Sequence, residues 1–188
     1  VFDGAFGAWQ VNFKPNLFQR PGNYRIIAWV NDQHHTDWSD PTNNEEANFG
    51  FGLSIDQELT DNIGFFTRYA WQNPDIFMDA DADGIAGDFS LEHSWSVGMQ
   101  FGGAIWGRAD DVWAFGVGQA IPSDDYEKAN PGIEAKSEGH FETYYSYKVN
   151  DHLTLSPDLQ VIWDPYGNDI PNGDDTIVVG GMRAQVDF

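Results

Sequence analysis

The stretch FETYYSYKVNDHLTLSPDLQVIW spans residues 141–163 and decides the fold. From Phe141 to Val149, and again from Leu153 to Trp163, a mainly apolar or aromatic set of residues alternates with a more polar set. A period of two is typical of a β-strand whose two faces meet different surroundings. Asn150 and Asp151 lie between the two runs as a tight turn. The stretch therefore predicts an antiparallel hairpin with one apolar and one polar face.

The same alternation recurs along almost the whole chain, so we expect an all-β, antiparallel fold. About nine runs show it, and they lie at 5–13, 24–34, 49–59, 63–73, 91–102, 112–121, 139–149, 153–163 and 176–188. Most runs have about 9–13 residues, whereas strands of soluble sheets usually have about 5–6. A tilted strand needs about 9–11 residues to cross a bilayer. Strand length therefore favours a transmembrane β-barrel.

The connections between the runs alternate in length. Very tight turns at 61–62 and 150–151, and moderately longer connections at 14–23 and 103–111, share one parity. The connections of the other parity, at 35–48, 74–90, 122–138 and 164–175, are long and rich in Asp, Asn, Gly and Pro. Outer-membrane barrels have short periplasmic turns and long extracellular loops. A soluble sandwich also alternates apolar and polar residues but has no reason to keep this parity.

Composition excludes several other classes. No run approaches the roughly 18 consecutive apolar residues of a transmembrane helix. The chain has no cysteine, which removes disulfides, thiolate zinc sites and cysteine nucleophiles. With 30 acidic and 9 basic residues the net charge is -21, so a phosphate backbone is repelled and we expect no nucleic-acid partner.

The last strand carries a further signal. Met182, Ala184, Val186 and Phe188 share one face, and the chain ends on an aromatic residue. This pattern resembles the C-terminal signal that the barrel-assembly machinery recognises. With the C-terminus at the periplasmic side, about nine strands would leave the first and last strands parallel, whereas simple antiparallel closure needs an even number. We therefore expect residues 1–188 to form the C-terminal portion of a larger barrel.

Several segments together resemble the carbohydrate-selective porin family typified by OprB. They are GNYRIIAW at 22–29, FGLSIDQEL at 51–59, GFFTRYAW at 64–71, WGRADDV at 106–112, and the hairpin quoted above with Asp164-Pro165 after it. The most specific pieces are the Trp-Gly-Arg-x-x-Asp motif and that hairpin. The resemblance implies a barrel of about sixteen strands in the bacterial outer membrane that passes mono- and oligosaccharides and is not an enzyme. It also implies contact with outer-membrane lipid and leaves either a monomer or a homo-oligomer open.

If the apolar faces meet lipid, the opposite faces line a pore. The candidate pore-lining and substrate-binding residues are Arg25, Trp29, Asp56, Arg68, Arg108, Glu142, Asp158, Gln160 and Arg183. Charges so placed create a transverse field and offer hydrogen bonds to hydroxyl groups. Arg68, Arg108 and Arg183 are candidates for an arginine ladder at a constriction. The same residues also fit a solvated wall with structural ion pairs.

One loop contains a partial calcium motif. Asp79, Asp81 and Asp83, followed by Gly84, match the first half of a D-x-D-x-D-G loop, in which alternate carboxylates converge on the cation. Ser90 stands where the closing Glu is expected, so a solvated acidic loop is the alternative to calcium in the 79–90 segment, and we expect no other cofactor. The alternatives for the whole protein are a structural, calcium-binding or adhesive outer-membrane barrel without a transport role, and a soluble all-β carbohydrate-binding or hydrolytic domain.

Overall fold

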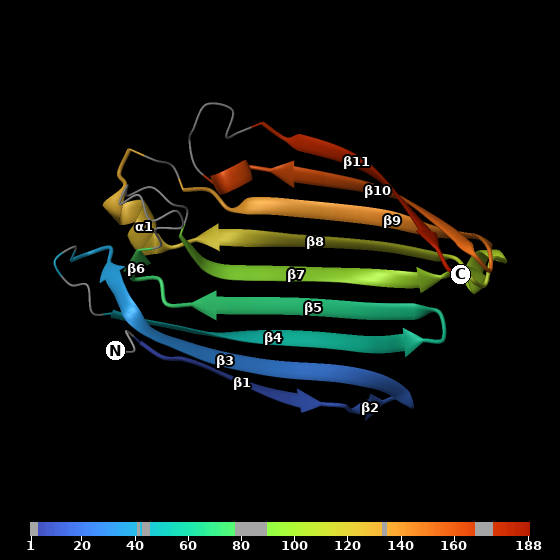
Figure 1. Ribbon diagram of the computed structural model, residues 1–188, viewed down its shortest axis with the longest axis horizontal. Helices are drawn as coiled ribbons and strands as arrows, with labels where there is room; N and C mark the ends of the chain where they lie inside the picture. The colour runs from blue at the N-terminus through green and yellow to red at the C-terminus, as the bar shows by residue number, and fades with distance from the viewer. Residues whose placement is uncertain (1–3, 41, 43–45, 78–89, 133–134, 168–174) are drawn as a thin grey trace.

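Nine long strands form one antiparallel sheet in the computed structural model, which describes residues 4–40, 42, 46–77, 90–132, 135–167 and 175–188 (Figure 1). The strands are β1 Phe6–Phe13, β3 Arg20–Asp37, β4 Glu46–Thr60, β5 Ile63–Gln72, β7 Leu91–Gly102, β8 Val112–Pro122, β9 Glu138–Asn150, β10 Leu153–Trp163 and β11 Ile177–Val186. They pair in this order, each with its neighbour along the chain. The nine predicted runs are thus confirmed, and two of them, 91–102 and 153–163, match the observed strands residue for residue.

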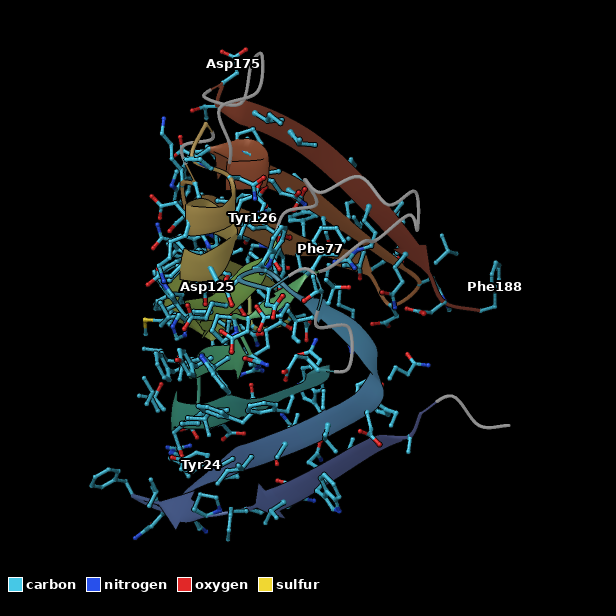
Figure 2. The ribbon with its side chains drawn as sticks, turned by 90° about the vertical axis from the view of Figure 1, so that its left-hand side faces the viewer. Tyr24, Phe77, Asp125, Tyr126, Asp175 and Phe188 are labelled. Atoms are coloured by element: carbon cyan, nitrogen blue, oxygen red, sulfur yellow. The ribbon has the colours of Figure 1, made fainter. Side chains whose placement is uncertain are left out.

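The sheet is open in this chain. Among the described residues, β1 and β11 each have a long hydrogen-bonded neighbour on one side only. Two very short strands were not predicted from sequence: β2 Asn16–Leu17 and β6 Ile76–Phe77, both of which pair with β3. Seen from one end, the sheet curves strongly from β1 to β11 (Figure 2). Strong curvature is what a sheet needs in order to belong to a closed barrel.

The two ends of the strands differ as the loop parity predicts. We call the end with the connections at 14–19, 61–62, 103–111 and 151–152 the short-turn rim, and the opposite end the long-loop rim (Figure 1). At the short-turn rim the 103–111 connection contains the 3₁₀ helix η1, Gly103–Trp106. At the long-loop rim lie helix α1, Asp124–Ala129, and the 3₁₀ helix η2, Pro165–Gly167. No helix in the described part of the chain is long and apolar enough to span a membrane.

The two faces of the sheet have opposite character. On one face, Ile26, Phe51 and Leu53 stay between 38% and 48% exposed although they are apolar. Aromatic pairs lie on this face towards each rim, with ring centroids of Phe101 and Trp113 5.2 Å apart towards the short-turn rim, and of Phe49 and Trp71 5.7 Å apart towards the long-loop rim. An apolar band between two aromatic girdles is the outer surface of a transmembrane barrel. We call this the apolar face and the other the polar face.

A small core, which sequence did not predict, lies at the long-loop rim. We call Trp38, Ile76, Phe77 and Tyr126 the loop core. Tyr126 is fully buried, and its ring packs edge-on against Trp38 with ring centroids 5.4 Å apart. The Phe77 ring also packs edge-on against Trp38, with ring centroids 4.7 Å apart. Ser123 begins α1 by accepting hydrogen bonds from the backbone of residues 125 and 126, and its hydroxyl donates to the Pro74 carbonyl at 2.6 Å. These contacts join three loops that are far apart in sequence.

Candidate functional site: the polar face of the sheet

An arginine–aspartate–arginine cluster occupies the polar face of β3, β4 and β5. Asp56 accepts a hydrogen bond from Arg25 Nη1 at 2.9 Å and another from Arg68 Nη2 at 2.6 Å. The three side chains meet because Arg25 and Arg68 both lie opposite Ser54 in the register of their strand pairs, two residues from Asp56. All three side chains are between 29% and 39% exposed, so water reaches the cluster. Two guanidinium groups on one carboxylate leave a local charge of +1.

Phe66 lies beside this cluster on a surface made by glycines. The register pairs Phe66 with Gly98 and Gly98 with Gly116, so the three residues share the polar face. A Cβ at Gly98 would lie 2.6 Å from Phe66 Cζ, and one at Gly116 would lie 3.2 Å from it. The ring therefore occupies the space that side chains would fill. The Arg68 guanidinium carbon lies 5.2 Å from the ring centroid, within range of a cation–π contact.

A second charged cluster occupies the polar face of β9, β10 and β11. Glu142, Asp158, Gln160 and Arg183 line one pocket of about 400 Å³, together with Tyr144 and Ser156. Gln160 lies opposite Glu142, and Arg183 lies opposite Ser156. Two carboxylates and one guanidinium leave a local charge of -1. The two clusters thus have opposite net charge and are separated by β7 and β8, which present Ser96, Gly98, Gly116 and Gly118 to the polar face.

Trp29 lies on the polar face nearer to the long-loop rim. Its register partners are Ala8 and Gly50, and a Cβ at Gly50 would lie 3.0 Å from the indole ring. Phe6 stacks on it with ring centroids 6.4 Å apart. As with Phe66, a bulky ring lies over a glycine because only glycine leaves room for it.

Arg108 lies apart from the other predicted residues. Its guanidinium hydrogen-bonds the buried carboxylate of Asp111, donates to the Lys148 carbonyl at 3.0 Å, and stacks 4.1 Å from the centre of the Tyr147 ring. These contacts are at the short-turn rim, and Tyr147 belongs to the apolar face because it pairs with Leu155. Arg108 therefore forms no ladder with Arg68 and Arg183. The hydrogen bond from Arg108 lowers the pKa of the Asp111 carboxyl far below its usual range.

The Trp-Gly-Arg-x-x-Asp motif thus holds the 103–111 connection against β9 through side-chain contacts. Trp106 Nε1 donates to the Tyr145 hydroxyl at 2.9 Å, and this hydroxyl donates to Asp111 at 2.7 Å. Gly107 adopts the left-handed conformation, with φ of 83°. Sequence reasoning did not identify Asp111 or Phe66 as residues of the site. For Phe66 the reason is that an aromatic residue in a strand gives no signal of the residue it packs against. The glycines at 98, 116 and 118 were the available signal, because three in neighbouring strands predict close approach of something bulky.

The predicted calcium ligands Asp79, Asp81 and Asp83 lie outside the described residues. Within the described ranges, no group of three or more His, Asp or Glu side chains is placed to hold a metal ion. The calcium loop therefore stays a prediction.

Comparisons with known proteins agree with the geometry. The family model described as "Carbohydrate-selective porin, OprB family" matches residues 1–188. Among solved structures, the chain resembles Pseudomonas putida OprB at high pH, with a TM-score of 0.79 and 20% sequence identity over 98% of this chain and 49% of that chain. It therefore spans about half the length of that structure, and at this identity the likeness shows the fold alone. No curated protein matches the sequence.

The fold, the exposed apolar face and the family model lead to one assignment. The open antiparallel sheet has the architecture of part of a transmembrane β-barrel, and its apolar face with aromatic girdles is the surface that contacts lipid in such barrels. The chain belongs to the OprB family of carbohydrate-selective porins, which are proteins of the bacterial outer membrane.

Proposed function

We propose that the complete protein is a passive channel for small solutes, mono- and oligosaccharides in particular, and that the polar face described above lines its lumen. The observation that carries this proposal is the segregation of the charged clusters on a single face. Arg25, Asp56 and Arg68 on one side, and Glu142, Asp158 and Arg183 on the other, share the polar face of a sheet whose other face is exposed and apolar. In a membrane, such a polar face must line water.

The arrangement suits neutral, hydroxylated solutes. The positive cluster on β3–β5 and the negative cluster on β9–β11 create a field across the lumen. Their guanidinium groups donate hydrogen bonds to the hydroxyl groups of a solute, and their carboxylates accept hydrogen bonds from them. Phe66 and Trp29 add aromatic surfaces beside these groups, and the apolar face of a sugar ring packs on such surfaces. Gly98 and Gly116 between the two clusters leave room for the Phe66 ring on the polar face.

The experiment is single-channel conductance of the full-length protein in planar bilayers, with glucose or maltodextrins added as blockers. We expect stable conductance steps that maltodextrins reduce in a concentration-dependent way. Arg68→Gln weakens this block, whereas Lys14→Gln, in the connection between β1 and β2, leaves it unchanged. Absence of any conductance in a correctly folded barrel would reject the channel in favour of a structural or adhesive barrel. Conductance without saccharide block would reject the sugar selectivity.

The predictions about partners also belong to this proposal. We expect the barrel-assembly machinery to recognise Phe188, two residues after the end of β11, and its deletion should slow assembly in cells. A monomer and a homo-oligomer both stay open, and the mass of the protein on a sizing column in mild detergent distinguishes them.

A further inference from the structure

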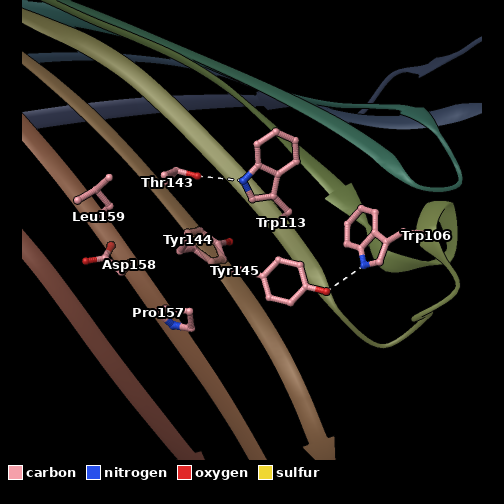
Figure 3. A pocket seen from close by; sticks show the side chains of 8 residues that line it. All are labelled: Trp106, Trp113, Thr143, Tyr144, Tyr145, Pro157, Asp158 and Leu159. Carbon is pink, nitrogen blue, oxygen red and sulfur yellow. Dashed lines mark hydrogen bonds between the residues drawn. The ribbon is translucent and has the colours of Figure 1, made fainter.

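An open groove lies on the apolar face, close to the short-turn rim. It has a volume of about 610 Å³ and is bordered by Trp106, Trp113, Tyr145, Pro157 and Leu159, with the small side chain of Thr143 among them (Figure 3). Tyr144 and Asp158, which also line the pocket on the polar face, complete the border. Thr143 lies opposite Phe115 on one side and Leu159 on the other, so a small residue separates large ones. Pockets of about 300–1,000 Å³ are of the size that binds drug-sized molecules.

The indole N–H groups of Trp106 and Trp113 and the hydroxyl groups of Thr143 and Tyr145 are already hydrogen-bonded within the protein. Trp113 Nε1 donates to Thr143 Oγ1 at 3.0 Å, and Thr143 Oγ1 donates to the Ala114 carbonyl at 2.9 Å. Trp106 Nε1 donates to the Tyr145 hydroxyl, as Figure 3 shows. Pro157 has no backbone N–H. An occupant therefore meets carbon atoms almost throughout, which suits a hydrocarbon chain.

The end of the groove towards the rim adjoins an exposed guanidinium that is paired with a carboxylate. Tyr145 hydrogen-bonds Asp111, and Asp111 in turn holds Arg108, whose side chain is 41% exposed. Arg108 uses Nε and Nη2 for its hydrogen bonds, and within the described residues none is formed by Nη1. Short turns face the periplasm in outer-membrane barrels, so Arg108 lies at the depth of the headgroups of the periplasmic leaflet.

We propose that this groove binds one glycerophospholipid of the periplasmic leaflet, with an acyl chain between Trp113 and Leu159 and its phosphate against Arg108. Position and hydrogen bonding favour this occupant over a second copy of the chain. The groove lies on the face that contacts lipid, and the exposed Arg108 side chain holds Asp111 through Nε and Nη2, which leaves Nη1 to donate to a phosphate oxygen. The proposal rests on the location in the outer membrane and not on the solute that passes.

The test uses the full-length protein, stripped of lipid in detergent and titrated with palmitoyl-oleoyl phosphatidylethanolamine, with bound lipid counted by native mass spectrometry. Thr143→Phe fills the groove, and Val161→Phe makes the same kind of enlargement on the apolar face of β10, outside the groove. We expect one tightly held lipid in the unsubstituted protein and in Val161→Phe. Thr143→Phe should bind it about tenfold more weakly, since losing the burial of about two methylene groups already corresponds to that factor.

The matching diacylglycerol, which has no phosphate, separates the two halves of the proposal. Weaker binding of diacylglycerol than of phosphatidylethanolamine supports the contact with Arg108, and equal binding overturns that contact. Equal lipid binding by both phenylalanine variants, whether retained or lost, overturns the groove as a specific site. A dimer that Thr143→Phe abolishes, in a protein that holds no lipid, shows that a second copy is the occupant and overturns the proposal. Heat-modifiable migration of Thr143→Phe on a detergent gel shows that the barrel is folded, and because it needs no conductance it keeps this test separate from that of the proposed channel.

Discussion

Replacing Gly98 with alanine tests the close packing of the Phe66 ring on Gly98. The added methyl group would lie 2.6 Å from Phe66 Cζ and would overlap the backbone carbonyl oxygen of Phe115. The phenyl ring can turn away into the lumen, but the carbonyl belongs to the neighbouring strand and cannot move without shifting the sheet. Overpacking of this kind costs about 1–3 kcal/mol. We therefore expect Gly98→Ala to lower the free energy of unfolding by that amount and to reduce conductance.

Gly64→Ala is the matched control. Gly64 also lies on the polar face, and a Cβ there meets nothing within 4 Å. Both substitutions reduce the entropy of the unfolded chain, which by itself stabilises by about 0.4–1 kcal/mol. The measurement is urea unfolding of the full-length barrel in detergent, followed by tryptophan fluorescence, together with single-channel conductance. Identical midpoints and identical conductance for the two variants would refute the close packing of Phe66 on Gly98.

Three further predictions concern the charged clusters and the loop core. Asp56→Asn leaves Arg25 and Arg68 without their shared carboxylate, so the reversal potential in a KCl gradient should shift towards anion selectivity. The control, Asp110→Asn in the 103–111 turn, should have little effect on the reversal potential. Equal shifts for the two variants would contradict a role of Asp56 in ion selectivity. Ser123→Ala removes the N-cap of α1 and the bond to Pro74, which should weaken the loop packing by about 0.5–2 kcal/mol and speed proteolysis at the long-loop rim without changing the strands. Burial and the nearby Asp125 raise the pKa of Asp75 in the folded protein, so the loop packing should weaken as pH rises from the ordinary aspartate value through the raised pKa. Proteolysis should therefore be slower at acidic pH, and the same pH dependence in Asp75→Asn would disprove the assignment.

Much of the fold could be predicted from the sequence because its signals are local. Alternation with a period of two sets each strand and its two faces, and connection length sets which rim each end belongs to. All nine strands follow from these two patterns. The loop core could not be predicted in this way: Trp38, Ile76 and Tyr126 come from three loops, and nothing in any one loop indicates that the other two pack against it.

The candidate site divides in the same way. Sequence parity alone placed Arg25, Asp56, Arg68, Glu142 and Arg183 on one face, because adjacent strand residues point to opposite sides. Only the tertiary structure decided which of them meet, since the Asp56 bridge depends on the register between β3, β4 and β5. The tertiary structure also shows that Arg108 is not part of the predicted arginine ladder, because Asp111 holds its guanidinium at the short-turn rim. The alternation of apolar and polar residues along a strand can be read from consecutive residues, whereas register and turn geometry depend on contacts between residues far apart in the chain.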